Sequence, residues 1–307
     1  MTKFLIVDGN SLGCRAAFAA PKHSKDLCTK ENIPTGTIVR FINMLNKVMC
    51  DIVKPTHIVV AWDTDANTFR KQLYPEYKAN RQAHKEQNDI DMHIVHKQFK
   101  MLRNMLEWLG IKNVNIQGFE GDDICGSFAT ISKADENYIV TGDKDSFQLV
   151  NDNTYIVYPK SGFTDVDIVN EQYINDKFNV SLDNYIGLKT LQGDASDNIH
   201  GFTGCGPKTA AKLLDEFGNS DIIARLKEEE LSTYNKKIKA GLADWQSRYE
   251  LLKTLVTIRT DVELPYTFDD CEIDLLKWDE LIPYMEQLEM NNFINRIKWG
   301  AVYRLHY

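Results

Sequence analysis

The chain has 307 residues, of which 43% are hydrophobic and 26% charged, as in a globular protein with one large domain and a smaller one. Its apolar runs are no longer than strands, which argues against a membrane span. The six cysteines form no Cys-x-x-Cys pair, which argues against a zinc site and favours reduced thiols in a cytoplasm. The net charge of −8 does not exclude a nucleic-acid partner, because it counts metal-binding carboxylates as bare charges.

Strands and amphipathic helices alternate along the first half of the chain. The expected strands cover residues 4–7, 57–62, 114–116, 138–141 and 155–158. The expected helices cover residues 36–52 and 95–109, and a third begins at Glu120. This order predicts an α/β domain with a mainly parallel sheet flanked by helices. Short helices dominate from about residue 182, so we expect domains of 1–176 and 177–307.

Nine carboxylates stand where strands should end or helices should begin. They are Asp8, Asp63, Glu120, Asp122, Asp123, Asp143, Asp145, Asp194 and Asp197. The carboxyl ends of parallel strands meet at one sheet edge, where ligands bind, and three strands would bring acids there. Clustered carboxylates repel one another unless a cation lies among them, and an all-oxygen set suits Mg²⁺ or Mn²⁺. The sequence therefore predicts a divalent-metal enzyme whose substrate carries phosphate.

Two further segments are suited to hold phosphate. Residues 70–85 are basic, with only Glu76 opposing, and cations beside a metal cluster are what a phosphodiester substrate requires. In residues 201–214, Gly204 and Gly206 permit a tight turn of positive φ, and Pro207 suits the first position of a helix. The free amides of this turn, with Lys208, would form a phosphate cradle of the helix–hairpin–helix type. The alternative is that this segment only connects two helices, with the glycines serving the turn and no phosphate bound.

Together these motifs resemble those of the 5′-nuclease (flap endonuclease) family, which includes the 5′-3′ exonuclease domain of bacterial DNA polymerase I and free-standing phage 5′-exonucleases. The motifs are Asp8-Gly-Asn, Trp62-Asp63, Tyr77-Lys-Ala-Asn-Arg81, Glu120-Gly-Asp-Asp123, Thr141-Gly-Asp-Lys-Asp145 and Gly193-Asp-Ala-Ser-Asp-Asn198, followed by the hairpin. They follow the family's order over residues 4–214. The resemblance implies a PIN-like 5′-nuclease core with a helical arch at about 64–95, then a helical DNA-binding region with a helix–hairpin–helix at about 185–220.

The resemblance also implies a role for each motif. One metal would be held by Asp8, Asp63, Glu120 and Asp122, and a second by Asp143, Asp145, Asp194 and Asp197. Asp123 matches an extra acid of the bacterial and phage branch. The implied catalytic residues are Lys78, Arg81, Asp8 and Asp143, with Lys78 and Arg81 neutralising the scissile phosphate. The implied DNA contacts are Arg70, Tyr77, Lys78, Arg81, Gly204, Gly206, Lys208 and Thr209, with Tyr77 stacking on a base at the 5′ end.

The implied reaction is hydrolysis of DNA at a 5′ flap or 5′ end in replication or repair, leaving a 5′-phosphate and a 3′-hydroxyl. Two Mg²⁺ ions would act, with Mn²⁺ as the substitute, and a K⁺ at the hairpin and RNA–DNA hybrid substrates are left open. Because the chain ends at Tyr307, we expect a stand-alone nuclease. We also expect a monomer in the cytoplasm of a bacterial cell or a phage-infected host.

Several of these assignments have an alternative. Asp123 is as well explained as an acid that stabilises a helix start. Tyr77 would otherwise pack into the arch, and Arg70 would otherwise lie on a solvated face. Arg15 would either contact the substrate or form a structural salt bridge. His93 and His96 have the helical spacing of a metal-binding pair, but no third ligand is near, so a position on the surface is favoured.

Two other function classes remain for the whole chain. Asp63-Thr-Asp65 faintly resembles the nucleophile motif of haloacid-dehalogenase phosphotransferases, but Asn67 stands where that motif has threonine. A non-catalytic DNA-binding relative would have lost acids, and here all of them are present. A trapped aspartyl-phosphate would separate the first class from a nuclease.

Overall fold

A six-stranded sheet forms the centre of the computed structural model, which describes residues 1–19, 26–64, 67–80, 91–161, 165–232, 234 and 236–304. Its strands are β1 (Lys3–Asp8), β2 (His57–Ala61), β3 (Lys112–Val114), β4 (Glu136–Val140), β5 (Thr154–Ser161) and β6 (Asp165–Val169), in the spatial order β3-β2-β1-β4-β5-β6. All neighbours are parallel except β5 and β6. The predicted α/β fold is confirmed, while the antiparallel strand β6 was not predicted.

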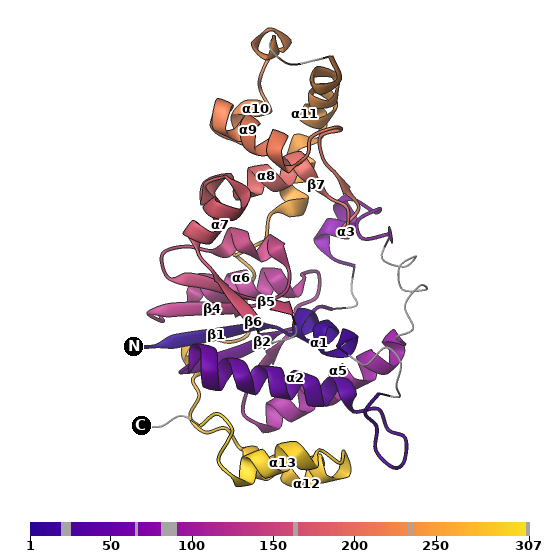
Figure 1. Cartoon of the computed structure of the whole chain (residues 1–307), viewed down its shortest axis with the longest axis vertical. Coiled ribbons are helices and arrows are strands. Elements are labelled where there is room, and N and C mark those ends of the chain that lie inside the picture. Colours follow the sequence, from indigo (N-terminus) through magenta and orange to yellow (C-terminus); the bar gives the residue numbers. More distant parts are fainter. Residues whose placement is uncertain are drawn as a thin grey trace.

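Helices cover both faces of this sheet, because the central strands are apolar on both sides. Leu5 and Val7 of β1 face a core shared with α1 (Gly9–Phe18), α2 (Gly36–Lys47) and α5 (Met92–Trp108). Phe4 and Ile6 face a second core shared with α6 (Gly121–Ile131). In Figure 1 these two layers lie below and above the sheet. The predicted helix over 36–52 is divided, since α2 passes into a π-helical turn, η1 (Val48–Val53).

Short helices follow the sheet and stand above it in Figure 1. They are α7 (Glu171–Phe178), α8 (Tyr185–Gln192), α9 (Pro207–Phe217), α10 (Ser220–Ile223) and α11 (Lys236–Val256), with the 3₁₀ turns η3 (Leu182–Asn184) and η4 (Glu228–Leu231). Short helices dominate here as expected, but the two-residue strands β7 (Gly193–Asp194) and β8 (Ile199–His200), which were not predicted, form a small hairpin among them. The remaining short elements are α3 (Phe69–Leu73), η2 (Lys144–Leu149) and η5 (Asp269–Cys271).

The last described segment returns to the sheet domain instead of joining the helical part. It comprises η6 (Trp278–Leu281), α12 (Ile282–Gln287) and α13 (Asn291–Lys298), which lie beneath α2 in Figure 1. Trp278 is fully buried, and its indole N–H donates to the Tyr303 carbonyl at 2.9 Å. The Tyr303 amide donates in turn to Asn46 Oδ1 of α2 at 2.8 Å. Residues 278–304 therefore complete the first core, and the boundary near 177 stays a prediction.

In the part of the chain that the structure describes, no helix combines the length and apolar character that crossing a membrane requires.

Candidate active site

Three neighbouring strands deliver an acid to the same edge of the sheet, as the sequence predicts. Asp8 ends β1, Asp63 follows β2, and Asp143 follows β4, and these strands are adjacent in the order β2-β1-β4. Asp8 also caps α1, since its Oδ1 accepts the Ser11 amide at 2.9 Å. Its Oδ2 accepts the Thr141 hydroxyl at 2.8 Å, which ties the ends of β1 and β4 together.

A first group of acids forms where the start of α6 meets this edge. Asp63 Oδ1 accepts the Gly121 amide at 2.7 Å, so the first turn of α6, which carries Asp122, is held against the end of β2. Burial, then the neighbouring Asp63, raises the pKa of Asp8 to about 7. Burial, then Asp123, also raises the pKa of Asp122 well above its usual value. The carboxylates are thus crowded enough for a cation among them to be strongly stabilising.

The second group is held by a lysine that the sequence did not point to. Lys189 Nζ of α8 lies 2.6 Å from Asp145 Oδ1 and 2.7 Å from Asp194 Oδ2, and its side chain is largely buried. Burial, then Asp143, still raises the pKa of Asp145 to about 7. A lone lysine five residues before an acid gives no sequence signal, so only the fold reveals this contact.

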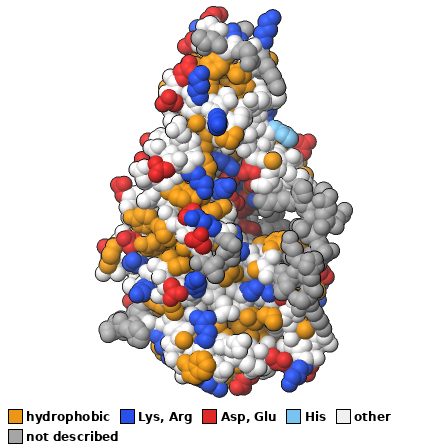
Figure 2. Space-filling view, viewed as in Figure 1, with side chains coloured by type: hydrophobic (Ala, Val, Ile, Leu, Met, Phe, Trp, Pro, Cys, Tyr) orange, Lys and Arg blue, Asp and Glu red, His pale blue; other side chains and the backbone are white. Residues whose placement is uncertain are grey.

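Tyr77 and Lys78, which follow α3, connect the two groups. The Tyr77 hydroxyl lies 2.9 Å from Glu120 Oε2 and 3.0 Å from Asp197 Oδ2. Lys78 Nζ lies 2.7 Å from Glu120 Oε1 and 3.8 Å from Asp197 Oδ2. The Lys78 amide also donates to the Asp197 carbonyl at 2.9 Å, which holds Lys78 in the left-handed region at φ 57°. Figure 2 shows basic and acidic side chains close together in the hollow between the sheet domain and the helical part.

The position of Tyr77 argues against its predicted role. Its side chain is only 3% exposed and belongs to the second core, so its ring is not available to stack on a base. The alternative of packing at the base of the arch agrees better with this placement. What the residue offers to the site is its hydroxyl, which burial and the carboxylates keep protonated by raising its pKa.

Arg70 and Asp123 are also placed differently from the prediction. They are 2% and 0% exposed and form a two-pronged ion pair, with both N–O distances at 2.7 Å. The two oxygens of Asp123 further accept the amides of Glu120, at 3.1 Å, and of Arg259, at 2.8 Å. Both oxygens are therefore occupied, which argues against Asp123 as a metal ligand and favours its role at the helix start. The guanidinium of Arg70 is equally engaged inside the protein, which argues against a DNA contact.

The predicted turn before α9 depends on one glycine, not two. Gly204 has φ +90°, whereas Gly206 has φ −88° and serves as the N-cap, followed by Pro207 in the first turn. A Cβ on Gly206 would contact nothing within 4 Å, so this position tolerates a small side chain. Lys208 is exposed and Thr209 partly so, but Pro207 has no N–H and the Thr209 amide donates to the Gly206 carbonyl at 3.0 Å. The hairpin is thus shaped as expected, although the φ-positive residue is Gly204 alone.

Part of the predicted arch lies outside the described residues. This applies to Arg81, to Asp65 of the alternative phosphotransferase motif, and to 82–90 of the basic stretch. The guanidinium of Arg15 lies near Gly142, because a Cβ there would come within 3.3 Å of Arg15 Nη2.

The donor chemistry of the two groups suits a hard divalent cation, although no metal geometry is preformed. Among the residues that the structure describes, no three Asp, Glu, His or Cys side chains converge as metal ligands do. Lys78 and Lys189 neutralise the acids instead, through the contacts given above. An all-oxygen ligand set with raised carboxyl pKa values fits Mg²⁺ or Mn²⁺. Binding of such an ion would require the ammonium groups of Lys78 and Lys189 to move away from the acids.

Comparison with known proteins identifies the family. A model described as the 5′-3′ exonuclease N-terminal resolvase-like domain matches residues 3–179, and one described as the 5′-3′ exonuclease C-terminal SAM fold matches residues 180–279. DNA polymerase I of Bacillus subtilis is 32% identical over 297 residues, which are 96% of this chain and 32% of that protein. DNA polymerase I of a Synechocystis strain is 34% identical over 96% of this chain and 30% of its own length. The chain thus spans about a third of these relatives.

Solved structures share the fold. A flap endonuclease of bacteriophage T5, in a complex with DNA and metal ions, is 23% identical with a TM-score of 0.63 over 94% of this chain and 98% of that one. A T5 5′-exonuclease with bound zinc is 23% identical with a TM-score of 0.62, over 83% and 88% of the two chains. The catalytic core of Rad2 in complex with DNA substrate is 17% identical with a TM-score of 0.62, over 94% and 88%. With two family models covering residues 3–279, the chain belongs to the 5′-3′ exonuclease family.

Proposed function

We propose that the protein is a metal-dependent 5′-nuclease that hydrolyses DNA as a 5′-3′ exonuclease and as a flap endonuclease. The observation that carries this proposal is the meeting of Asp8, Asp63 and Asp143 at one sheet edge, opposite the acids of α6 and of the β7–β8 hairpin. Membership of the 5′-3′ exonuclease family supports the direction of the reaction.

Two Mg²⁺ ions, with Mn²⁺ as the substitute, suit the two groups of acids. Asp8, Asp63, Glu120 and Asp122 would hold one ion, and Asp143, Asp145, Asp194 and Asp197 the other. When bound, such ions supply the charge that activates water and stabilises the leaving 3′ oxygen. The solved relatives with metal ions support a divalent cofactor, although one of them holds zinc.

The protein's own groups orient the substrate around these acids. Lys78, whose ammonium is held by Glu120, would turn to the scissile phosphate when DNA and metal arrive, and Arg81 would assist it. The Tyr77 hydroxyl, which contacts both Glu120 and Asp197, would keep these two carboxylates in place relative to each other. Arg15 lies near Gly142 between two of the acid-bearing strand ends and would serve as a further phosphate contact.

The turn at Gly204 and the start of α9 would hold the duplex part of the substrate. The exposed Lys208 and the positive end of the α9 dipole suit backbone phosphates, which position a duplex without reading its sequence. A K⁺ bound at the hairpin would strengthen the same contact. We include RNA–DNA hybrids among the substrates, and we propose that the protein acts as a monomer in the cytoplasm of a bacterial cell or a phage-infected host.

A 5′-labelled flap duplex tests this function directly. We expect cutting in Mg²⁺ or Mn²⁺ and none after chelation. Asp145→Asn should abolish cutting while DNA binding holds or rises, because one negative charge is removed near the phosphate. Asp152→Asn is the matched control and should cut normally, because this exposed acid precedes the start of β5, at the opposite end of the parallel strands from the site. Cutting that survives chelation, or an Asp145 variant with wild-type rate at low Mg²⁺, would refute the proposal.

A further inference from the structure

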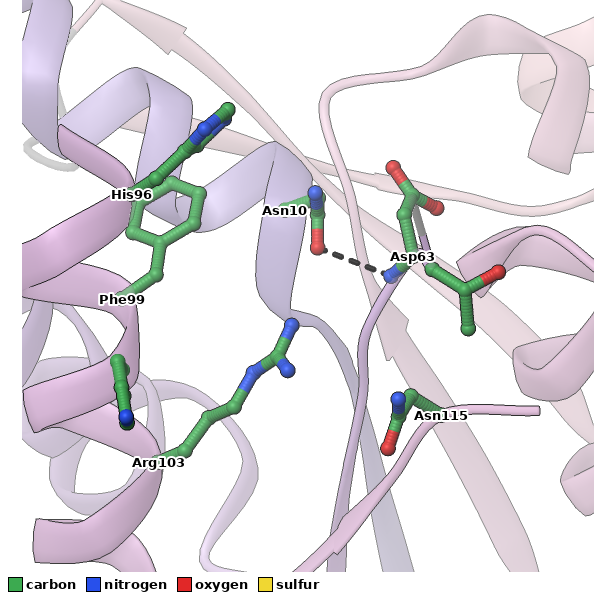
Figure 3. Close-up of a pocket in the computed structure, with 8 residues that line it drawn as sticks. Asn10, Asp63, His96, Phe99, Arg103 and Asn115 are labelled. Atoms are coloured by element: carbon green, nitrogen blue, oxygen red, sulfur yellow. Dashed lines mark hydrogen bonds between the residues drawn. The ribbon is translucent and has the colours of Figure 1, made fainter. Parts of the chain in front are cut away.

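A pocket beside the first group of acids has no role in the function proposed above. Its cavity volume is about 410 Å³, within the range of small-ligand sites. Its lining includes His96, Lys100 and Arg103 of α5 together with Asn10, Asp63 and Asn115. Figure 3 shows His96 and Arg103 on one side of the pocket and Asn10, Asp63 and Asn115 on the other. It lies between the ends of β2 and β3, the start of α1 and the outer helix α5.

The α5 wall concentrates positive charge on one helix face. His96, Lys100 and Arg103 are spaced four and three residues apart, which aligns their side chains on the same side of the helix. The guanidinium of Arg103 lies 4.8 Å from the centre of the Trp62 ring, so a buried aromatic side chain helps to fix its direction. In Figure 3 it reaches from α5 toward the space between Asn10 and Asn115.

The opposite wall offers hydrogen-bond donors and a single acid. Asn10 uses its Oδ1 to accept the Asp63 amide at 3.0 Å, so its NH₂ group is the end that serves as donor. Asn115 presents a second side-chain amide. Asp63 is the only carboxylate of the lining, and its Oδ1 is already engaged by the Gly121 amide. The lining thus combines two basic side chains, one imidazole and two side-chain amides with a single carboxylate. This combination favours binding of an anion, and a phosphate group suits its charge and its hydrogen-bond donors.

We propose that this pocket receives the terminal 5′-phosphate of the strand being cut, so that the protein distinguishes a 5′-phosphorylated end from a 5′-hydroxyl end. The inference rests on the proposed function, because that function brings the strand past Asp63. Asp63 belongs both to the metal-binding acids and to the pocket, so the pocket adjoins the reacting position without coinciding with it. Lys100 and Arg103, which line the pocket, would supply the charge that neutralises a phosphate there.

Binding in Ca²⁺ tests the proposal without relying on cleavage. Fluorescence anisotropy would compare two DNA duplexes with a short 5′ single strand, identical except for a 5′-phosphate or a 5′-hydroxyl. The wild-type protein should bind the phosphorylated end about tenfold more tightly, as expected for one charge-assisted contact. Lys100→Met should remove this preference while leaving affinity for the hydroxyl end unchanged. Lys97→Met, an exposed lysine of the same helix outside the pocket, is the matched control and should keep the preference.

Three results would overturn the proposal. They are a wild-type protein with no preference, equal losses on both ends in Lys100→Met, and the same loss in Lys97→Met. A deoxynucleoside 5′-monophosphate that competes as well as the phosphorylated strand would assign the pocket to the released product instead of the strand. Failure of the nuclease function would show separately, as a wild-type protein that binds with this preference but does not cut in Mg²⁺.

Discussion

Replacing Arg70 by methionine would break the most buried ion pair among the described residues. The guanidinium donates to both oxygens of Asp123 at 2.7 Å, and also to the carbonyls of Leu255 at 3.0 Å and Thr257 at 2.9 Å. It therefore joins the segment at the base of the arch to the start of α6 and to the chain leaving α11. Methionine fills part of the volume but satisfies none of these acceptors.

The loss in the free energy of unfolding depends on the Asp123 carboxylate, which remains buried in the Arg70→Met variant. Asp123 is 0% exposed, so without Arg70 its charge would lie buried with only two amide donors. Breaking a buried pair from one side costs about 3–5 kcal/mol. Since a domain of this kind is stable by about 5–15 kcal/mol, the variant should lose roughly a fifth or more of its free energy of unfolding.

Urea unfolding followed by circular dichroism, in chelator, would measure this loss. The double variant Arg70→Met, Asp123→Asn should cost less than the sum of the single variants, because asparagine leaves no buried charge. Arg259→Met is the matched control, since the side chains of its ion pair with Asp261 are 44% and 63% exposed, and it should change stability little. If Arg70→Met left stability unchanged and only weakened DNA binding, Arg70 would be a surface contact and the buried pair would be refuted.

Four further predictions concern the acids and the hairpin. Tyr77→Phe should lower the single-turnover rate about tenfold with unchanged DNA binding, because it removes the hydroxyl that bridges the two acid groups; an unchanged rate would make the residue purely structural. Lys78→Ala should lower that rate by roughly 10²–10³-fold, and a loss of affinity alone would make it an anchor. Lys189→Met should tighten Ca²⁺ binding in calorimetry by about tenfold or more, since its ammonium no longer competes for the same acids, and weaker binding would contradict this. Gly204→Val should weaken duplex binding in a way that fades with rising salt, whereas Gly206→Ala should not, and equal effects would reject the turn geometry.

The sequence was a good guide where a feature is local. The runs that end at Asp8 and Asp63 are continuously apolar, so both the strands and the acids that follow them could be predicted. Helix α1 was missed because Gly9 and Gly13 weaken its pattern, and the structure shows that they are needed where Trp62 and Phe99 come close.

Long-range contacts could not be predicted in this way. The partner of Arg70 lies 53 residues further along the chain, and a basic residue in a basic stretch looks the same whether it faces solvent or a buried acid. The same holds for Tyr77, whose hydroxyl contacts an acid 120 residues away. Gly206 was misjudged for a different reason, since a glycine permits positive φ without requiring it.

The return of residues 278–304 to the sheet domain has a consequence for synthesis on the ribosome. The core that begins with Leu5 of β1 is completed by Trp278, Phe293 and Tyr303, so it cannot close until residues 278–303 have been translated. Until then the apolar surface of α2 that these residues cover stays open, which is the situation in which nascent chains aggregate or recruit chaperones. A chain stopped after residue 279, where the second family model ends, would carry every candidate acid and still leave that surface uncovered. Residues 278–303 are thus far from Asp8 and Asp63 in sequence, yet the sheet domain that carries these acids completes its core only when they have been added.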